Sequence, residues 1–452
     1  MEIQFLGAAE TVTGSKYLLR IESTHVLVDC GLYQGLKEYR LRNWSSFPFK
    51  AKDIDCVLLT HAHIDHSGYL PLLIKNGFQG PIYCTAGTRD LCNVLLPDSG
   101  YLQEEEAQTA NRHGYSKHHP ALPLYTKLDA EKALEYFKPV GYRTKVVLGK
   151  ELSAQFIPAG HIIGASLVEI NYKGSTILFS GDLGRPHDMI MKPPALVKGA
   201  NYLIVESTYG DRLHDKESPM VKLAEIINRT VARGGSVIIP SFAVGRAQSL
   251  IYYICLLKKE NKIPNIPVFL DSPMAIKATD IFCSHMQDHR LNRNEIEEFN
   301  DVATYVNTIE DSKRIDNFAY PIIIISASGM ATGGRVLHHL KLFAPDRRHT
   351  ILFAGYQAPG TRGDRIVKGE KAVKIHGMMV PIEAEVAQLD NVSAHADYEE
   401  ILGWLSHFEY SPKKVFITHG DIQAAISLKE KIETKFHWKC IVPEYLQIEK
   451  LK

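Results

Sequence analysis

The sequence predicts an α/β fold of two domains, one of which is inserted into the other. Short runs of β-branched and aromatic residues between turn residues recur through residue 207, a pattern typical of strands. From about residue 208 to 378 helical and strand patterns alternate, which predicts a parallel sheet with helical crossovers. Strand patterns return after residue 378. We therefore expect one domain from segments 1–207 and 379–452, with 208–378 as the insertion.

Each expected element rests on its hydrophobic spacing and on the turn residues beside it. In the first segment, strands are expected at 2–6, 17–22, 25–28, 54–59, 153–157, 167–171, 176–179 and 202–205, and helices at 89–112 and 130–137. In the middle segment, helices are expected at 219–233, 247–260 and 334–343, and strands at 236–239, 268–270 and 322–325. In the last segment, strands are expected at 384–389 and 415–418, and a helix at 422–434.

Composition excludes several classes of protein. With 45% hydrophobic and 23% charged residues, the 452-residue chain is globular rather than disordered, collagen-like or coiled-coil. It has no apolar run near the roughly 18 residues of a membrane helix, and its start lacks the basic region of a secretory signal. Seven scattered cysteines without a CxxC motif indicate reduced thiols, so we expect a cytoplasmic protein. A net charge of +1 means that any polyanionic partner must bind a local concentration of positive charge.

The densest chemical signal is a group of three histidines and one aspartate after the expected strand at 54–59. His61, His63, Asp65 and His66 stand within six residues of one another. A lone histidine is usually a surface or core residue, but folding stability does not require three imidazoles and a carboxylate at one turn. Metal binding explains the group better.

Further ligands are expected where other strands end, because loops from distant parts of the chain converge there. Histidine or a carboxylate follows five more strand patterns, at Asp29, His161, Asp182, Glu206 and His419. Each alone could be a turn residue or a helix cap. Together they offer more nitrogen and oxygen donors than one tetrahedral Zn²⁺ accepts, which indicates two metal ions. Two ions about 3.5–4 Å apart lower the pKa of a shared water from about 15.7 toward 7, so the sequence predicts hydrolysis by a bridging hydroxide.

This ligand pattern resembles the metallo-β-lactamase superfamily, whose fold is an αβ/βα sandwich. The insertion and its flanks resemble the β-CASP branch of RNA nucleases, which includes the subunit that cuts pre-mRNA before polyadenylation. The motifs that carry this resemblance are ESTYG at 206–210, PSFAVGRAQ at 240–248, SASGMATGGR at 326–335, GYQ at 355–357 and SAHAD at 393–397. The resemblance covers essentially the whole chain and implies a sandwich with an inserted α/β (β-CASP) domain.

The resemblance also implies roles for individual residues. One Zn²⁺ would be held by His61, His63 and His161, the other by Asp65, His66 and His419, with Asp182 bridging the two. Asp29 would orient the ligand loop through hydrogen bonds. Asp65 and Asp182 thereby count among the catalytic residues. Because DNA-specific repair nucleases of the branch usually lack the last histidine, His419 indicates RNA.

A leaving 3′-oxygen needs a proton that the metal ions cannot supply, so we expect a general acid. His395 is the candidate, and Glu206 would fix its tautomer and raise its pKa. The alternative is that His395 is only a helix-start residue beside Asp397, which could cap the next helix.

Substrate binding is expected from the inserted domain. A glycine-rich loop at a helix start suits a phosphate, and so do guanidinium groups, which gives Ser328, Gly329, Gly333, Arg335 and Arg246 as phosphate-binding candidates. The basic run at 362–374 is either a solvated face or a track for the RNA backbone.

The sequence therefore predicts a two-zinc ribonuclease that cleaves single-stranded RNA endonucleolytically. It leaves open a 5′-exonuclease or a DNA nuclease. It also leaves open a small-molecule metallohydrolase acting on lactams or thioesters, and a non-catalytic RNA-binding subunit. The expected partner is single-stranded RNA, no membrane partner is expected, and a homodimer is left open.

Overall fold

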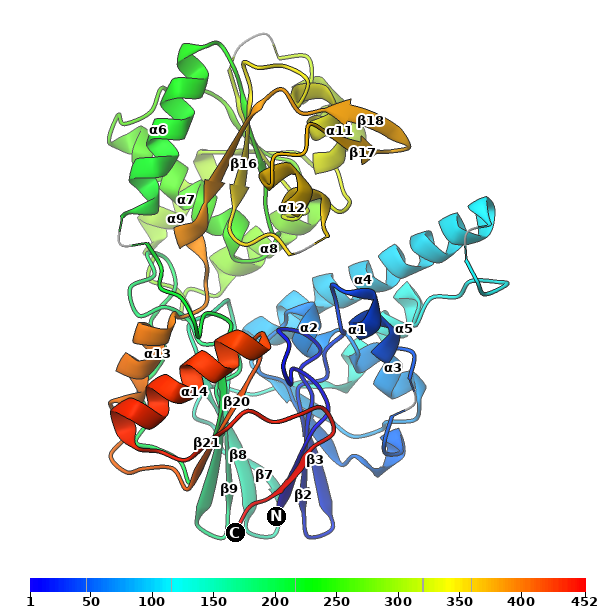
Figure 1. Cartoon of the computed structure of the whole chain (residues 1–452), viewed down its shortest axis with the longest axis vertical. Helices are drawn as coiled ribbons and strands as arrows, with labels where there is room; N and C mark the ends of the chain where they lie inside the picture. The colour runs from blue at the N-terminus through cyan, green and yellow to red at the C-terminus, as the bar shows by residue number, and fades with distance from the viewer. Residues whose placement is uncertain (46, 115, 216, 319–320, 359) are drawn as a thin grey trace. The chain divides into compact units, whose positions relative to one another are not determined.

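The computed structural model describes residues 1–452 except 46, 115, 216, 319–320 and 359 (Figure 1). The chain forms two compact units, one from residues 1–213 and 395–452 and the other from residues 214–394. Among the described residues, no helix has both the length and the apolar character needed to cross a membrane.

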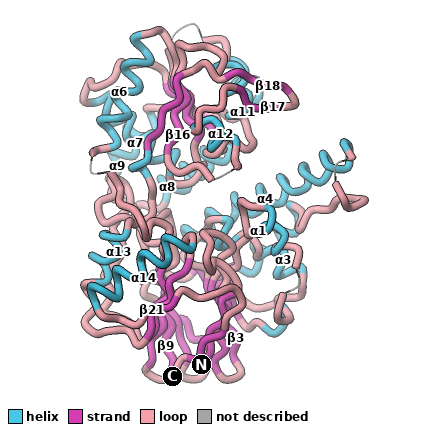
Figure 2. The backbone as a smooth tube through the Cα atoms, viewed as in Figure 1, coloured by secondary structure: helices cyan, strands magenta, loops and turns pink. Residues whose placement is uncertain are grey.

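The first unit is built on two seven-stranded sheets (Figure 2). In the first sheet the strand order is β22 (Ile448–Lys450), β1 (Glu2–Phe5), β2 (Tyr17–Ile21), β3 (Thr24–Val28), β4 (Cys56–Leu58), β5 (Ile82–Cys84) and β6 (Phe137–Pro139). In the second sheet it is β21 (Cys440–Ile441), β20 (Lys414–Thr418), β11 (Tyr202–Glu206), β10 (Ser175–Phe179), β9 (Ser166–Tyr172), β8 (Leu152–Pro158) and β7 (Val146–Gly149). One hydrophobic cluster joins the two sheets, with Phe5 against Phe416 at 5.2 Å and Tyr17 against Phe179 at 5.6 Å between ring centroids.

Helices cover the outer faces of this sandwich (Figure 1). They are α1 (Lys37–Arg42), α2 (Ile64–Ser67), α3 (Leu70–Lys75), α4 (Ala86–His113), α5 (Lys127–Ala133), α13 (Tyr398–Leu405) and α14 (Ile422–Phe436). Local signals fix their ends: Thr85 caps the start of α4 by accepting a hydrogen bond from the Thr88 amide at 3.2 Å, and α4 ends at Gly114. The predicted αβ/βα sandwich is therefore confirmed.

The second unit contains a six-stranded parallel sheet, as the alternating pattern predicts. Its order is β14 (Thr304–Tyr305), β13 (Val268–Leu270), β15 (Ile323–Ser326), β12 (Val237–Pro240), β16 (Thr350–Ala354) and β19 (Glu385–Leu389). Its helices are α6 (Pro219–Ala232), α7 (Arg246–Lys259), α8 (Pro273–Ser284), α9 (Arg293–Asp301), α10 (Ile309–Ile315), α11 (Val336–Phe343) and α12 (Arg362–Val367). Strands β17 (Ala372–Ile375) and β18 (Met378–Pro381) form a separate antiparallel hairpin.

One expected boundary differs from the structure. The sequence predicts the strand at 384–389 as part of the C-terminal segment, but β19 pairs in parallel with β16 and completes the inserted sheet. The second unit therefore extends to residue 394 rather than ending at 378. A strand pattern alone does not say which of two sheets will accept the strand.

Candidate metal centre

Five strands of the sandwich end at the predicted site residues. Asp29 follows β3, His161 follows β8, Asp182 follows β10, Glu206 ends β11 and His419 follows β20. The pairs β3–β4, β10–β11 and β11–β20 are parallel, so the carboxyl ends of these strands share one edge within each sheet. Polar side chains from distant parts of the chain therefore lie at the carboxyl ends of these strands.

Two neighbouring loops form backbone hydrogen bonds to the histidine-rich loop at residues 61–66. The Ser15 amide donates to the Asp65 carbonyl at 2.8 Å, and the Cys30 amide donates to the His66 carbonyl at 2.7 Å. Gly31 lies so close to this loop that an added Cβ would come 1.6 Å from the Asp65 carbonyl oxygen. Backbone contacts, rather than side-chain packing alone, thus set the position of the ligand residues.

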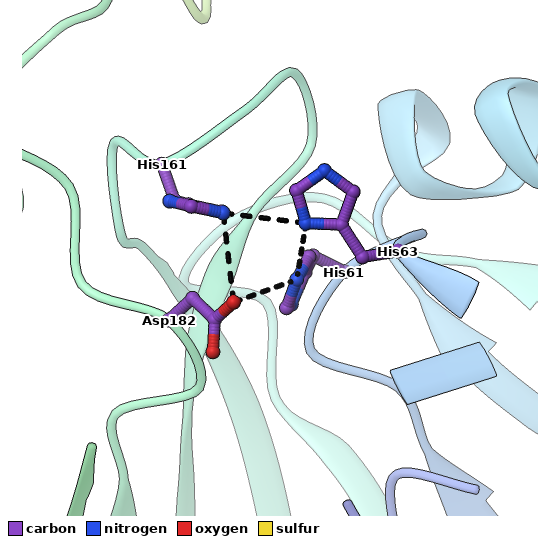
Figure 3. A group of neighbouring side chains, drawn as sticks. All are labelled: His61, His63, His161 and Asp182. Carbon is purple, nitrogen blue, oxygen red and sulfur yellow. Dashed lines mark hydrogen bonds and ion pairs between the residues drawn. The ribbon is translucent and has the colours of Figure 1, made fainter. Parts of the chain in front are cut away.

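His61, His63, His161 and Asp182 point toward a common centre (Figure 3). Nδ1 of His63 lies 3.2 Å from Nε2 of His61 and 3.3 Å from Nε2 of His161. Oδ2 of Asp182 lies 3.3 Å from Nε2 of His61 and 3.5 Å from Nε2 of His161. Ligand atoms at about 2.0–2.1 Å from a tetrahedral Zn²⁺ are about 3.3 Å apart, so these spacings fit one ion.

A second group of ligand atoms adjoins the first. Nε2 of His66 lies 3.0 Å from Nε2 of His419, which lies 3.4 Å from Oδ2 of Asp65. The other oxygen of Asp182, Oδ1, lies 3.2 Å from Nε2 of His66. Asp182 thus presents one carboxylate oxygen to each group. Within the described part of the chain, Oδ1 is buried and accepts no hydrogen bond, as expected of an atom suited to a cation.

The protonation states of His61, His161 and Asp182 suit metal binding. For His66, burial alone would lower the pKa, but Asp182 and Asp29 hold it well above the ordinary value. Burial lowers the pKa of His61 to about 3, and burial lowers the pKa of His161 well below its ordinary value. Burial alone would raise the pKa of Asp182, but His419, His66 and His61 hold it well below the ordinary value. Neutral imidazoles and an ionised carboxylate are the forms that coordinate a divalent ion. The residues present therefore fit a pair of metal sites.

Asp29 forms a hydrogen bond with a predicted ligand histidine, and its orienting role stays a prediction. Its Oδ2 lies 2.8 Å from Nδ1 of His66, which leaves Nε2 of that ring facing the ligand group. The Thr60 amide donates to Oδ1 of Asp29 at 2.8 Å, and the Thr60 hydroxyl donates to Oδ2 at 2.9 Å. Asp29 has a φ of 58°, a left-handed conformation that this network holds in place.

His395 and Glu206 meet beside the ligand groups. Nδ1 of His395 lies 3.1 Å from Oε2 and 3.2 Å from Oε1 of Glu206, and its Nε2 lies 4.0 Å from Oδ2 of Asp182. Glu206 also accepts a hydrogen bond from the Leu183 amide at 2.5 Å. Burial alone would lower the pKa of His395, but Glu206, with Asp182 and Asp65, raises it to about 9. Asp397 caps α13 by accepting a hydrogen bond from the Glu400 amide at 2.9 Å, as the helix-start alternative for His395 also expects.

Three contributing residues carry no signal that reveals their role in the sequence. The Thr208 hydroxyl lies 3.2 Å from Nδ1 of His419 and fixes that ring as Asp29 fixes His66. Thr60 binds Asp29 as described above. Lys16 is buried, donates to the Gly31 carbonyl, and lies 4.8 Å from the ring centroid of Tyr33. A threonine or lysine next to a strand is too common for sequence reasoning to single out.

The predicted phosphate-binding residues lie in the second unit, where several have intramolecular partners. Arg335 donates to Oδ1 of the buried Asp271 at 2.7 Å and to two backbone carbonyls, and Arg246 donates to the Ala354 carbonyl. The Ser328 hydroxyl accepts from the Thr332 amide at 3.0 Å, and the Gly329 carbonyl accepts from Gln357 at 3.2 Å. The region around Gly333 is open. Their phosphate-binding role stays a prediction.

Three family models together match most of the chain. Residues 11–228 match the metallo-beta-lactamase superfamily, 247–366 match the Beta-Casp domain, and 379–443 match the Zn-dependent metallo-hydrolase RNA specificity domain. The third match begins within the second unit, at residue 379 in β18, and continues into the first.

Curated relatives align with nearly the whole of this chain. Ribonuclease TTHA0252 of Thermus thermophilus is 36% identical over 95% of both chains. Transcription termination factor FttA of Methanosarcina mazei is 31% identical over 96% of this chain and 70% of its own. FttA of Methanocaldococcus jannaschii is 28% identical over 100% of this chain and 72% of its own.

A solved structure from Enterococcus faecalis V583, described as a protein of unknown function, matches 100% of this chain and 99% of its own. Its TM-score is 0.57 at 14% sequence identity, so it shows a shared fold only. The family models and the relatives go further, and the ligand geometry agrees with them. The chain therefore belongs to the metallo-beta-lactamase superfamily, in the β-CASP branch of RNA nucleases, and is a metal-dependent hydrolase.

Proposed function

We propose that this protein is a two-zinc ribonuclease that cleaves phosphodiester bonds of single-stranded RNA at internal positions. The observation that carries the proposal is Asp182, whose two carboxylate oxygens face two separate ligand groups beside the His395–Glu206 pair. The matched RNA specificity domain and the relative named as a ribonuclease support an RNA substrate.

Each ligand group would hold one Zn²⁺, the first through His61, His63 and His161, the second through Asp65, His66 and His419, with Asp182 shared. When bound, such ions lower the pKa of water and neutralise charge on a phosphoryl oxygen. Asp29 and Thr208 hold the His66 and His419 rings, so that the two imidazoles need not reorient when an ion binds.

His395 would donate the proton that the departing 3′-oxygen requires. Nδ1–H of His395 would donate a hydrogen bond to Glu206, so a protonated His395 carries its second proton on Nε2, the nitrogen on the side of Asp182. The same carboxylate favours the protonated ring, and a general acid must be in that form before cleavage. Glu206 would thus act indirectly, by orienting His395 and favouring its protonated form. His395 itself would contact the reacting atoms.

The test uses purified, zinc-loaded protein with single-stranded RNA and DNA of the same sequence, each labelled at either end. Internal RNA products from both labels, with no DNA cleavage, would support the proposal. Mononucleotides released only from the 5′ end would establish the exonuclease alternative instead. Turnover of a chromogenic lactam or a glutathione thioester, without RNA cleavage, would overturn the assignment as a nuclease.

A further inference from the structure

A group of basic side chains lies on the second unit around the turn of the β17–β18 hairpin. We call it the cationic patch, and its members are His338, Lys341, Arg362, Lys374 and His376. The imidazole rings of His338 and His376 lie 4.6 Å apart between centroids, and both residues are exposed. His376 and Gly377 form the two-residue turn, with φ of 47° and 83°, so the hairpin fixes where this histidine stands.

Arg362 fastens the patch to the glycine-rich loop. Its Nε donates to the Lys374 carbonyl at 2.9 Å, and its Nη1 donates to the Ala331 carbonyl within that loop. The Gly363 amide adds a hydrogen bond to the Met330 carbonyl at 3.0 Å. The hairpin, the start of α12 and the loop are therefore one hydrogen-bonded assembly, and the patch continues directly from the predicted phosphate-binding residues.

The patch carries the positive charges of Lys341, Arg362 and Lys374 without carboxylate partners. Burial lowers the pKa of His376, and the neighbouring His338, Lys341 and Arg362 lower it further. Among the described residues, none of the five members forms an ion pair with a carboxylate. A bound anion would relieve this mutual repulsion, which gives the patch an attraction for phosphate that an internally paired surface lacks.

Neighbouring basic residues of the same run are different. Arg365 pairs with Glu370, and Lys368 pairs with Asp364 at 2.9 Å. The basic run at 362–374 thus divides into cations that already have a carboxylate partner and cations that do not. The pairing supplies two control positions, Arg365 and Lys368, in the same basic run as Lys374.

Apolar side chains adjoin the cations. Met379 is directly opposite Lys374 in the hairpin and is 62% exposed, and Met378 is 48% exposed. Exposed rings and flexible apolar side chains among unpaired cations suit a strand whose bases are free to stack and whose phosphates repeat. An acidic protein segment would use the cations but would gain less from the paired imidazole rings.

We propose that the cationic patch binds the phosphates of single-stranded RNA, as a contact separate from the metal ligands and additional to the glycine-rich loop. This proposal rests on the proposed function, since it assigns part of the substrate grip to these residues. It predicts that the double variant Lys341→Ala/Lys374→Ala weakens RNA binding and releases fewer counterions. The matched control is Arg365→Ala/Lys368→Ala, which removes two cations that already have carboxylate partners.

Binding is measured by fluorescence anisotropy with labelled single-stranded RNA of about 30 nucleotides, on zinc-loaded protein in a His395→Ala background so that RNA is not consumed. We expect the patch variant to lower the slope of log K against log salt by about 1.4, or about 0.7 for each lost phosphate contact. The control variant should change the slope by much less. An unchanged slope and affinity in the patch variant would overturn the proposal.

The histidines provide a second readout. Binding to the parent protein should strengthen as the pH falls from about 8 to 6, because a bound phosphate favours protonated imidazole. The charged groups that act on His376, besides His338, are Lys341 on α11 and Arg362 on α12, and Lys374 stands two residues before His376 on β17. The variant His338→Asn/His376→Asn should lose most of this pH dependence, and its retention would argue against the patch.

Separate outcomes distinguish this proposal from the ribonuclease assignment. If wild-type protein cleaves RNA but the patch variants bind RNA normally, the patch fails and the proposed function stands. If wild-type protein cleaves no RNA but the patch variants lose RNA binding, the patch proposal stands and the ribonuclease assignment fails. Binding of polyglutamate in preference to RNA would identify the patch as a docking surface for an acidic protein and overturn the RNA assignment.

Discussion

Nδ1 of His395 lies 3.1 Å from Oε2 of Glu206, a carboxylate that is almost fully buried at the end of β11. The two residues are 189 positions apart in the chain, Glu206 at the end of a strand and His395 just before helix α13. In the proposed mechanism, this buried carboxylate holds the 20% exposed imidazole so that one ring nitrogen is oriented and protonated for use. The pairing therefore separates two tasks: Glu206 fixes the ring, and His395 faces the site.

Replacing His395 by alanine should lower kcat on RNA by about 10²–10⁴-fold while the metal content stays near that of the wild type. The physical reason is loss of the proton donor, since no metal ligand is removed. Single-turnover cleavage and metal analysis check the two parts separately. His407→Ala, an exposed histidine at the end of α13, is the matched control and should leave both unchanged. Loss of zinc from the His395 variant would show that His395 is structural.

Replacing Asp29 by asparagine should weaken metal binding by about 10–100-fold, because the His66 ring loses its charged hydrogen-bond partner. Asparagine keeps the size of the side chain and can still accept from the Thr60 amide, so the loop should remain folded. Zinc affinity is measured by competition with a chromophoric chelator. Wild-type affinity in this variant would mean that the carboxylate charge of Asp29 contributes little to the site.

The sequence was sufficient to predict the sandwich, the insertion and a set of residues that converge on the candidate metal centre. His61, His63, Asp65 and His66 could be identified because they are adjacent, and Asp182 because a strand pattern precedes it. Their convergence follows from strands whose carboxyl ends share an edge, a general property of open α/β sheets. Local sequence signals and the resemblance to known motifs agree at these positions.

Other features depend on contacts between residues distant in the chain. The sheet that receives β19 is decided by its pairing with β16, which no local pattern encodes. The buried partner of Arg335 is Asp271, 64 residues away, so a guanidinium predicted to bind phosphate also holds its own loop. Thr208 acts on His419 only because β11 and β20 are neighbours in the sheet. Threonine and arginine are common residues, so their roles here depend on the tertiary contacts that they form.

Replacing Gly31 by alanine should destabilise the ligand loop, because the new Cβ would lie 1.6 Å from the Asp65 carbonyl oxygen. We expect a cost of about 1–3 kcal/mol or more, with a lower thermal midpoint and lower metal content. Gly403→Ala on α13 is the control, since nothing lies within 4 Å of its added Cβ. That substitution should be neutral or stabilising, by up to about 1 kcal/mol. Equal midpoints for the two variants would contradict the close approach of the two loops.

The buried pair of Asp271 and His339 should make the stability of the second unit depend on pH. Burial alone would lower the pKa of His339, but hydrogen bonds to Asp271 and Asp316 raise it above its ordinary value. Burial alone would raise the pKa of Asp271, but hydrogen bonds from His339, Ser312 and Arg335 lower it. Each group is thus stabilised in its charged form, through contacts of 2.7 Å between Nε2 of His339 and Oδ2 of Asp271 and 2.9 Å between Nδ1 of His339 and Oδ1 of Asp316.

The sign of the effect follows from the two directions. The contribution of His339 is fully present below its unfolded pKa of about 6.5 and is lost as the pH rises through its raised folded value. The contribution of Asp271 is present above about pH 3.9 and is lost as the pH falls through its lowered folded value. His339→Asn should therefore destabilise the protein more at about pH 5.5 than at pH 9, measured by urea unfolding. His113→Asn, at the exposed end of α4, is the control. An equal loss at both pH values in the His339 variant would show that the ring is held neutral.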